Sequence, residues 1–323
     1  MPVIASLTLN PAMDLSVSTA RVTSTEKLRC SLPRHDPGGG GINVARVVDT
    51  LGGEAVAVYP AGGPFGDLLT RALDELGLAH RPVPIAGDTR ESFTVDEFET
   101  GLQYRFVLPG PSLSSEELAR CLDALTSLDP VPAYLVLSGS FPPGVALTFY
   151  DDLLSLTRRI GARLVVDLSG EPLAYAARQG GAYLLKPSLN ELSTLVGRPI
   201  TSELEQEQAL RGLMARGSAQ IIVLSLGADG ALVACGEQLQ RLRSPQVPAV
   251  SAVGAGDSML GAIVLGLAEG RSLDEAVRYG IAAGAATVMR PGTELCHCED
   301  VQRLLQLGDG SGLSSRSGSP AGI

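Results

Sequence analysis

The sequence has no tryptophan, and aromatic residues make up only 4% of its 323 residues. Proteins that bind single-stranded nucleic acid stack bases on aromatic rings, and this chain offers few of them. Its net charge of −10 also argues against a chain-wide basic field for a phosphate backbone. We therefore expect no nucleic-acid partner. Any positive charge that meets an anionic ligand must be concentrated locally.

Long apolar runs are missing as well. The longest, residues 259–268, has about half the length of a bilayer span. No basic segment precedes the strand-like "VIASLTL" at the N-terminus, which predicts neither a signal peptide nor an anchor. The five cysteines are odd in number and scattered, which suits a reducing compartment. We expect a cytoplasmic protein with no membrane partner.

Lysine is nearly absent. Of the 25 basic residues only Lys27 and Lys186 are lysines, and all the others are arginines. A lysine side chain carries a compact, mobile point charge that a planar guanidinium does not reproduce. The two retained lysines therefore mark candidate binding positions.

Short apolar runs alternate regularly with amphipathic patterns along the chain. The apolar runs "VIASLTL", "AVAVYP", "YLVLSG", "RLVVDLS", "YLLKP" and "QIIVLSL" are separated by amphipathic patterns, clearest at residues 42–51, 65–76, 114–127 and 189–196. Such alternation predicts βαβ units and an α/β fold with a buried, mainly parallel sheet. Ligands of these sheets bind at the carboxyl ends of the strands.

Two segments interrupt the alternation. Residues 14–35 and 90–108 contain strand-like stretches, among them "EKLRCSL", with mixed polar and apolar faces and no helical pattern. They predict a small antiparallel lid beside the main sheet. The Gly/Ser-rich residues 309–323 predict a disordered C-terminal tail. We expect a single α/β domain over residues 1–308, with lid strands at about 14–35 and 90–108.

The stretch "SAVGAGDSMLGAIVLGLAEG" predicts an anion site. Gly254, Ala255 and Gly256 precede a helix that is apolar nearly all round. Small residues leave successive N–H groups accessible, and the helix N-terminus adds about half a positive charge. Asp257 in the first turn is either a helix cap or a general base beside a transferring phosphoryl group.

Two further strand ends could face the same ligand. In "LLKPSLNEL", Lys186 follows an apolar strand, and Glu191 lies one turn into the next helix, where it could hold a metal-bound water. The alternative is a surface lysine and a capping glutamate. In "VLSLGADGALV", a strand ends at Ser225 and Gly227, which could cradle a nucleotide or form an ordinary hairpin turn.

The stretch "DPGGGGINVARVVDTLGG" places four glycines directly before a helix. It is either a flexible turn or a place where a ligand touches backbone without an intervening side chain. It does not match the Gly-x-Gly-x-x-Gly dinucleotide loop, and the following strand ends in "VYP" without an acid, so a nicotinamide enzyme fits poorly.

Together, "GGGGINVAR" and "VGAGDSMLGA" resemble the two signature regions of the ribokinase-like (PfkB) carbohydrate kinases, and the resemblance runs from about residue 3 to 308. It implies a ribokinase-like three-layer sandwich with a mainly parallel central sheet and a small β-strand lid. Within the family, "EKLRC", "QYRFVLPG", "LSGSFPPGV" and "RPGTELC" resemble the type II bacterial 6-phosphofructokinases. Members that act on fructose 1-phosphate or tagatose 6-phosphate usually carry Gly-Gly-Lys-Gly at the first signature, whereas Gly40 stands at the third position here.

The implied reaction is transfer of the γ-phosphate of MgATP to the 1-hydroxyl of fructose 6-phosphate. Two alternatives within the family are a tagatose-6-phosphate kinase and a 1-phosphofructokinase. A third, of another class, is a sugar-phosphate-binding regulator with impaired catalysis. Ser188 favours that third reading, because it replaces the asparagine that is usual at this position in the family.

The resemblance also implies site residues. Asp14, Gly39, Gly40, Asn43 and Ser140 would contact the sugar, and Lys27, Arg29 and Arg90 its 6-phosphate. Lys27 and Arg29 would reach across a homodimer interface formed by the lid strands. The nucleotide would meet Lys186, Ser188, Glu191, Ser225, Gly227 and Gly230, with Glu191 orienting Mg²⁺ through water.

For catalysis, the resemblance implies Asp257 as the general base and an anion hole formed by Gly254, Ala255 and Gly256. It also implies a monovalent cation, K⁺, held by backbone carbonyls near Ser251, Val253, Thr287, Arg290 and Gly292.

Overall fold

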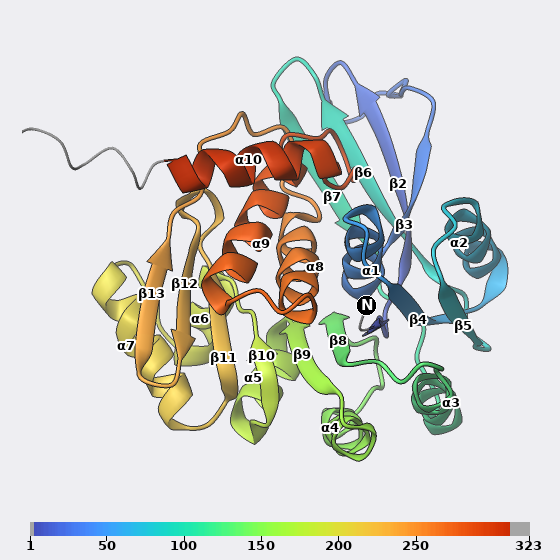
Figure 1. The fold of residues 1–323 in the computed structure, drawn as a ribbon. Helices are drawn as coiled ribbons and strands as arrows, with labels where there is room; N and C mark the ends of the chain where they lie inside the picture. Colours follow the sequence, from blue (N-terminus) through green and yellow to red (C-terminus); the bar gives the residue numbers. More distant parts are fainter. Residues whose placement is uncertain (1–2, 311–323) are drawn as a thin grey trace, which may run out of the picture.

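The computed structural model describes residues 3–310, which form a nine-stranded sheet and a four-stranded sheet (Figure 1). The order of the large sheet is β13 (Gln238–Leu242), β12 (Ala231–Cys235), β11 (Ala219–Ser225), β10 (Ala182–Leu185), β9 (Arg163–Leu168), β8 (Tyr134–Gly139), β1 (Ile4–Leu7), β4 (Ala55–Ala61) and β5 (His80–Pro84). All neighbours from β5 to β11 pair in parallel, while β12 and β13 are antiparallel additions.

Helices cover both faces of this sheet. One face packs against α1 (Gly40–Thr50), α2 (Gly63–Glu75), α8 (Ala255–Ala268), α9 (Leu273–Val288) and α10 (Cys298–Gly310). The other packs against α3 (Ser115–Thr126), α4 (Phe149–Ile160), α5 (Gly170–Gln179), α6 (Leu189–Val196) and α7 (Glu203–Ala215). Two separate hydrophobic clusters fill the two interfaces. The predicted three-layer α/β sandwich is confirmed.

The central helix of the first layer is α8. Its residues 258–266 are all buried, because it lies between α1 and α9 against the sheet (Figure 1). This burial explains why its sequence is apolar nearly all round. Among the described helices, none combines the length and hydropathy that a bilayer span requires.

The predicted lid exists, but its pairing differs from the expectation. Its order is β3 (Arg34–Gly38), β2 (Ala12–Thr19), β6 (Arg90–Glu97) and β7 (Leu102–Val107). The outer pairs are antiparallel, whereas the central pair β2–β6 is parallel, so the expectation of an all-antiparallel lid was wrong. After β2 the chain adds β3 to the lid and then β4 and β5 to the main sheet. It returns to the lid as β6, which runs parallel to β2.

A second correction concerns residues 20–33, which join β2 to β3. The stretch "EKLRCSL" was expected to be a strand but lies in an irregular, exposed loop. The Ser31 N–H of this loop donates a hydrogen bond to the Ser18 carbonyl of β2 (2.8 Å), but the loop does not pair with β2 as a strand. At the other end of the chain, α10 continues through Gly310, past the expected start of the tail at residue 309, and residues 311–323 lie outside the described range.

Candidate active site

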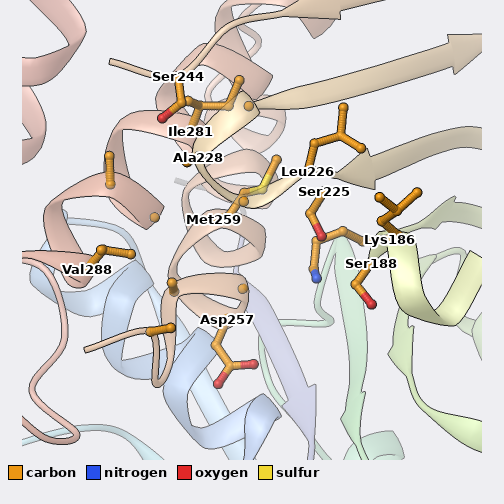
Figure 2. Close-up of a pocket in the computed structure, with 18 of the residues that line it drawn as sticks. Lys186, Ser188, Ser225, Leu226, Ala228, Ser244, Asp257, Met259, Ile281 and Val288 are labelled. Atoms are coloured by element: carbon orange, nitrogen blue, oxygen red, sulfur yellow. The ribbon is translucent and has the colours of Figure 1, made fainter. Parts of the chain in front are cut away.

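The carboxyl ends of β8, β9, β10 and β11 open into a cavity of about 860 Å³. This position matches the rule that open parallel sheets bind ligands beyond the carboxyl ends of their strands. Figure 2 shows Asp257 at one end of the cavity, with Lys186 and Ser188 across from it. The volume is within the range of about 300–1,000 Å³ that is usual for small-molecule sites.

Asp257 lies where α8 begins. The helix cap is Gly254, whose left-handed backbone (φ 75°) turns the chain into the helix, so the capping interpretation of Asp257 was wrong. Asp257 is the third helical residue, and its Oδ2 accepts a hydrogen bond from Nδ2 of Asn43 on α1 (2.8 Å). Ala255, Gly256 and Asp257 line the cavity, so the positive end of the helix faces it.

Lys186 is deeply buried directly after β10, with 4% of its side chain exposed. Its Nζ lies 3.0 Å from Oδ2 of Asp167, at the carboxyl end of neighbouring β9. Burial opposes the charge on Lys186, but the carboxylates of Asp167, Asp257 and Glu191 together more than offset it, so the pKa of the ammonium lies above its ordinary value. The lysine is thus a fixed, charged group in the cavity, and the surface-lysine interpretation was wrong.

Asp167 was missed at the sequence level. Its signal is the one that singled out Lys186: a charged residue at the carboxyl end of an apolar strand, here "RLVVDLS". The geometric argument on strand ends applies equally to both positions.

Ser188 and Glu191 form a capping box at the start of α6. The Glu191 Oε2 atom accepts from the Ser188 N–H and from the Ser188 hydroxyl, both at 2.8 Å, and the Ser188 Oγ accepts from the Glu191 N–H at 3.3 Å. The capping interpretation of the glutamate therefore holds. Both residues also line the cavity, so capping and a role toward a ligand are compatible.

The stretch from Ser225 to Gly230 is both a turn and a cavity wall. It links β11 to β12 through the short helix η1 (Gly227–Asp229), as the hairpin interpretation predicted. Ser225, Gly227 and Gly230 all line the cavity. Beyond them the wall is apolar, with Ala228, Met259, Ile281 and Val288 labelled in Figure 2. A flat, weakly polar group fits this end of the cavity, while a charged group fits the end at Lys186 and Asp257.

Of the expected sugar contacts, Ser140 lines this cavity, whereas Asp14, Gly39, Gly40 and Asn43 are not part of its lining. Gly39 caps α1 with φ 116°, a conformation that favours glycine, and Gly40 begins the helix. Asn43, one turn later, hydrogen-bonds Asp257, so the first signature meets the second through this contact. Asp14 on β2 pairs in register with Asp36 of β3 and lies against Gly38, on the same side of the lid. Asp257 therefore stands between two groups of candidate ligand contacts.

Arg90 is oriented by a network that the sequence did not reveal. At the start of β6 its Nε donates to the Asn10 Oδ1 (3.0 Å), its Nη2 to the Asn10 carbonyl (3.1 Å) and its Nη1 to the Ser92 Oγ (3.0 Å). The Asn10 Nδ2 in turn donates to the Ser140 Oγ (2.9 Å), and Ser140 lines the cavity. Asn10 thus ties the lid arginine to the β8 end of the cavity.

Lys27 and Arg29 are not brought to this group. Both lie in the exposed loop between β2 and β3, and neither lines the cavity of its own chain. The expectation that they act across an interface stays a prediction.

The five residues expected around a monovalent cation do come together. The Ser251 hydroxyl donates to the Gly292 carbonyl (2.7 Å) and accepts from the Val253 N–H (3.3 Å), while the Arg290 N–H donates to the Thr287 carbonyl (2.9 Å). Ser251, Val253, Thr287 and Gly292 are buried. The segment before α8 therefore lies against the end of α9 and the loop that follows it, beside the start of α8.

Three carboxyl groups of the site have raised pKa values. Burial raises the pKa of Asp167, although the neighbouring Lys186 opposes the shift. Burial raises the pKa of Asp257 to about 7, and the Asp167 carboxylate adds to the shift, while the hydrogen bond from Asn43 opposes it. Burial also raises the pKa of Asp14 to about 6, against the attraction of Arg90 and Arg105. A carboxylate with a pKa near 7 is suited to take a proton at neutral pH.

A family model described as pfkB family carbohydrate kinase matches residues 2–300. The chain belongs to this family. It is 48% identical over 306 residues to the ATP-dependent 6-phosphofructokinase isozyme 2 of Mycobacterium tuberculosis (strain CDC 1551 / Oshkosh), covering 95% of this chain and 90% of that protein. As a member of the pfkB family it is a sugar kinase, and the fold described above is the ribokinase-like fold.

Solved structures of phosphofructokinases have the same fold. Phosphofructokinase-2 from Escherichia coli in complex with fructose-6-phosphate superposes with a TM-score of 0.89 at 40% identity, covering 96% of this chain and all of that one. The same protein in complex with potassium gives a TM-score of 0.91 at 40% identity and the same coverage. The pfkB kinase described here thus resembles these structures over its main sheet and its lid.

Proposed function

We propose that the protein is an ATP-dependent 6-phosphofructokinase that converts fructose 6-phosphate to fructose 1,6-bisphosphate. The observation that carries this proposal is the place of Asp257. Its carboxylate lies at the positive end of α8, faces the large cavity and is held by Asn43 of the sugar side. The names of the relatives, 6-phosphofructokinase isozyme 2 and a phosphofructokinase-2 in complex with fructose-6-phosphate, support this choice of sugar phosphate.

In the proposed mechanism, Asp257 accepts the proton of the sugar 1-hydroxyl as that oxygen attacks the γ-phosphorus. A new P–O bond forms, the bond between the γ-phosphorus and the β,γ-bridging oxygen breaks, and ADP leaves. The N–H groups of Ala255, Gly256 and Asp257 stabilise the negative charge on the transferring group. Phosphoryl transfer depends mainly on positioning and electrostatics, and the Lys186 ammonium, held in place by Asp167, adds a positive charge to the cavity.

The sugar would lie between the lid and α1. Asp14 accepts hydrogens from sugar hydroxyls, which a carboxylate does well, and Gly39 and Asn43 present backbone and amide groups. Arg90, fixed by Asn10 and Ser92, faces the 6-phosphate. A guanidinium held in this way pairs with phosphate oxygens at a low entropic cost.

Magnesium fits this site as a companion of the nucleotide. Among the described residues no three His, Cys, Asp or Glu side chains cluster as a metal cage. Mg²⁺ usually keeps several waters and binds through one or two carboxylates plus substrate phosphates. Glu191 and Asp167 line the cavity and would serve in this way, and the bound ion would neutralise charge on the phosphates.

For K⁺, the backbone carbonyls near Ser251, Val253, Thr287, Arg290 and Gly292 are the fitting donor type.

The lid supports the proposal of a homodimer. Large apolar side chains are exposed on it and on its loops: Leu32, Phe98, Leu102, Phe106, Val107 and Leu108. A patch of this kind is typical of an interface. Packing two lids together would cover these side chains and bring Lys27 and Arg29 toward the partner's cavity.

All five cysteines are free thiols, which supports a cytoplasmic location.

A coupled assay of ADP release with MgATP tests the proposal. Fructose 6-phosphate, tagatose 6-phosphate and fructose 1-phosphate are titrated separately. We expect the highest kcat/KM with fructose 6-phosphate. A preference for another sugar phosphate would overturn the proposed substrate while leaving the kinase chemistry in place. Absence of ADP release, together with sugar-phosphate binding measured by calorimetry, would instead favour a binding protein.

Replacing Arg90 with alanine is expected to raise KM for fructose 6-phosphate roughly 10–100-fold, since hydrogen bonds to charged groups contribute about 1.5–3 kcal/mol. KM for ATP should change little, because Arg90 lies on the lid side. Arg211→Ala, which removes an exposed arginine of α7, is the matched control. Equal changes in both KM values would contradict a role in sugar-phosphate binding.

The pH dependence of kcat/KM provides another prediction. Because the pKa of Asp257 is raised to about 7, its carboxylate becomes protonated below that pH and can no longer accept a proton. We expect kcat/KM to fall about tenfold per pH unit below this value. The raised pKa of Asp14, about 6, adds a second, lower limb. In Asp257→Asn the upper limb should vanish and the lower limb remain. Persistence of both limbs in the variant would assign the upper one elsewhere.

A further inference from the structure

Outside the cavity, a set of four polar side chains joins the lid to the loop between α9 and α10. The set, called the clasp below, consists of Arg34 and Asp36 of β3 and Thr293 and Glu294 of the loop. Asp36 Oδ2 accepts from the Arg34 Nε (2.7 Å) and from the Thr293 Oγ1 (2.5 Å). The Arg34 Nη2 donates to the Thr293 Oγ1 (3.2 Å), and its Nη1 lies 3.7 Å from the Glu294 Oε2.

On the lid side, the clasp connects to the proposed sugar site. Asp36 is in register with Asp14, so the two carboxylates occupy directly paired positions of β2 and β3. The next residue, Pro37, accepts a hydrogen bond at its carbonyl from the Arg46 Nη1 (2.9 Å). The same Nη1 reaches the Asn43 Oδ1 (3.3 Å), and Asn43 holds Asp257. A shift of β3 would therefore displace Asp14 directly and Asp257 through Arg46 and Asn43.

On the loop side, the clasp connects to the start of α8. Gly292, adjacent to Thr293, accepts at its carbonyl from the Ser251 hydroxyl (2.7 Å). Ser251 belongs to the segment that leads to Gly254, the cap of α8. Leu295, on the other side of Thr293, packs so tightly on Gly254 that a Cβ there would lie 2.7 Å from its Cδ2. The clasp loop thus forms the back wall of the anion hole.

The clasp is built for a fixed geometry. Thr293 is buried, with 6% exposure, and the Asp36 side chain is only 17% exposed. Arg34 is 41% exposed and exposed ion pairs contribute little, so the contact between Thr293 and Asp36 is the one that fixes the geometry. Asp36 receives two donors from separate parts of the chain, so its position depends on the lid and the loop together.

We propose that the clasp couples the lid to the anion hole, so that sugar-phosphate binding and nucleotide binding strengthen each other. This inference rests on the proposed function. Arg34, Asp36 and Thr293 act as positioning residues, since none of them lines the cavity. Sugar phosphate that orders the lid fixes β3, and β3 fixes the loop behind the residues that receive the nucleotide phosphates. By linkage, nucleotide binding then raises the affinity for the sugar phosphate by the same factor.

The test measures this factor directly. The dissociation constant of fructose 6-phosphate is determined by calorimetry without nucleotide and with a saturating, non-transferable β,γ-imido analogue of MgATP. For the wild-type protein we expect the ratio of the two constants to lie in the range of about 5–150 that is typical of coupled sites. In Thr293→Val, which removes the hydroxyl and keeps the volume, the ratio should fall toward one. The dissociation constant without nucleotide should change less than threefold.

Controls separate coupling from simple destabilisation. Thr293→Ser keeps the hydroxyl and should restore the wild-type ratio, and Thr126→Val on the exposed side of α3 should leave it unchanged. Asp36→Ala, which removes the acceptor of the Thr293 hydroxyl, should resemble Thr293→Val, and the double variant should lower the ratio no further than Asp36→Ala alone, because both substitutions remove one shared contact. Melting temperatures measured beside the calorimetry report whether each variant is folded.

The outcomes are distinguishable. If Thr293→Val is folded and keeps the wild-type ratio, the clasp proposal is overturned and the contact only stabilises the fold. If the wild-type protein phosphorylates fructose 6-phosphate with a ratio of one, the clasp proposal also fails while the proposed function stands. If the wild-type protein neither binds nor phosphorylates this sugar, the proposed function itself fails. A lowered ratio restored by Thr293→Ser supports the clasp.

Discussion

Replacing Asp257 with asparagine is expected to lower kcat by about 10²–10⁴-fold, the usual contribution of general-base assistance. Asparagine has nearly the same shape, and its side-chain oxygen can still accept the hydrogen bond from Asn43. The cavity and the fold should therefore be preserved. What is lost is the ability to take the proton from the attacking hydroxyl, which acts in the transition state and not in ground-state binding.

This expectation is checked by measuring kcat and both KM values, with fructose 6-phosphate binding followed separately by calorimetry. The substitution should leave sugar-phosphate affinity within a few-fold of wild type. Asp123→Asn on the exposed side of α3 serves as a matched control, because it makes the same chemical change at a residue that does not line the cavity. A kcat for Asp257→Asn close to that of the control would exclude Asp257 as the base. A collapse of sugar-phosphate affinity at unchanged kcat would make Asp257 a binding residue instead.

Much of the main fold could be predicted because the signal is local. Buried parallel strands appear as short apolar runs, and the helices between them keep their amphipathic period. The expected helix at residues 189–196 coincides with α6, and those at 42–51 and 114–127 differ from α1 and α3 by one or two residues at each end. Because apolar residues repeat with different periods in helices and in strands, a short stretch of sequence is enough to tell the two apart.

The lid was harder because its pairing is not local. The parallel β2–β6 contact joins residues 12–19 to residues 90–97, and no local pattern specifies such a partner. Strand β3 contains Pro37 and a glycine and was not expected to be a strand, yet an edge position tolerates proline since no ladder donor is needed there. The stretch "EKLRCSL" alternates like a strand, but in this chain it has no strand partner to complete a ladder.

In the candidate site, too, residues with a local sequence signal could be predicted, and residues that depend on distant partners could not. Asp257, Lys186 and the glycines could be chosen from the sequence because each stands next to a recognisable helix start or strand end. Asp167 carries the same strand-end signal and was overlooked, while Asn10 stands at no such position and could not be chosen in this way. The roles of both residues depend on their partners. Asp167 matters because Lys186 is 3.0 Å away on the neighbouring strand. Asn10 matters because it contacts both Arg90 and Ser140, which are far apart in the sequence.

The second prediction with a large expected effect concerns Gly40, the first residue of α1. A Cβ at this position would lie 2.3 Å from the Ser138 Oγ, 3.0 Å from the Gly139 nitrogen and 3.2 Å from the Asp257 Oδ1. The first two distances are shorter than real Cβ contacts allow, or close to that limit. Since Gly139 contributes backbone, α1 or the end of β8 must move. We expect Gly40→Ala to lower kcat/KM by about 100-fold or more, because a displacement of about 1 Å at a reacting centre has an effect of this size.

Two further variants show whether this steric contact is the cause. Ser138→Ala removes the atom at 2.3 Å, so the double variant Gly40→Ala/Ser138→Ala should recover part of the activity, while the contact with the Gly139 nitrogen keeps the recovery incomplete. Gly212→Ala in α7 is the matched control, since its Cβ would meet nothing nearer than 3.6 Å. That control should keep full activity and gain about 0.5–1 kcal/mol in stability. Full activity in Gly40→Ala would mean that the chain relaxes there without disturbing Asp257. The run of glycines would then serve the turn into α1, and not the space beside the reacting group.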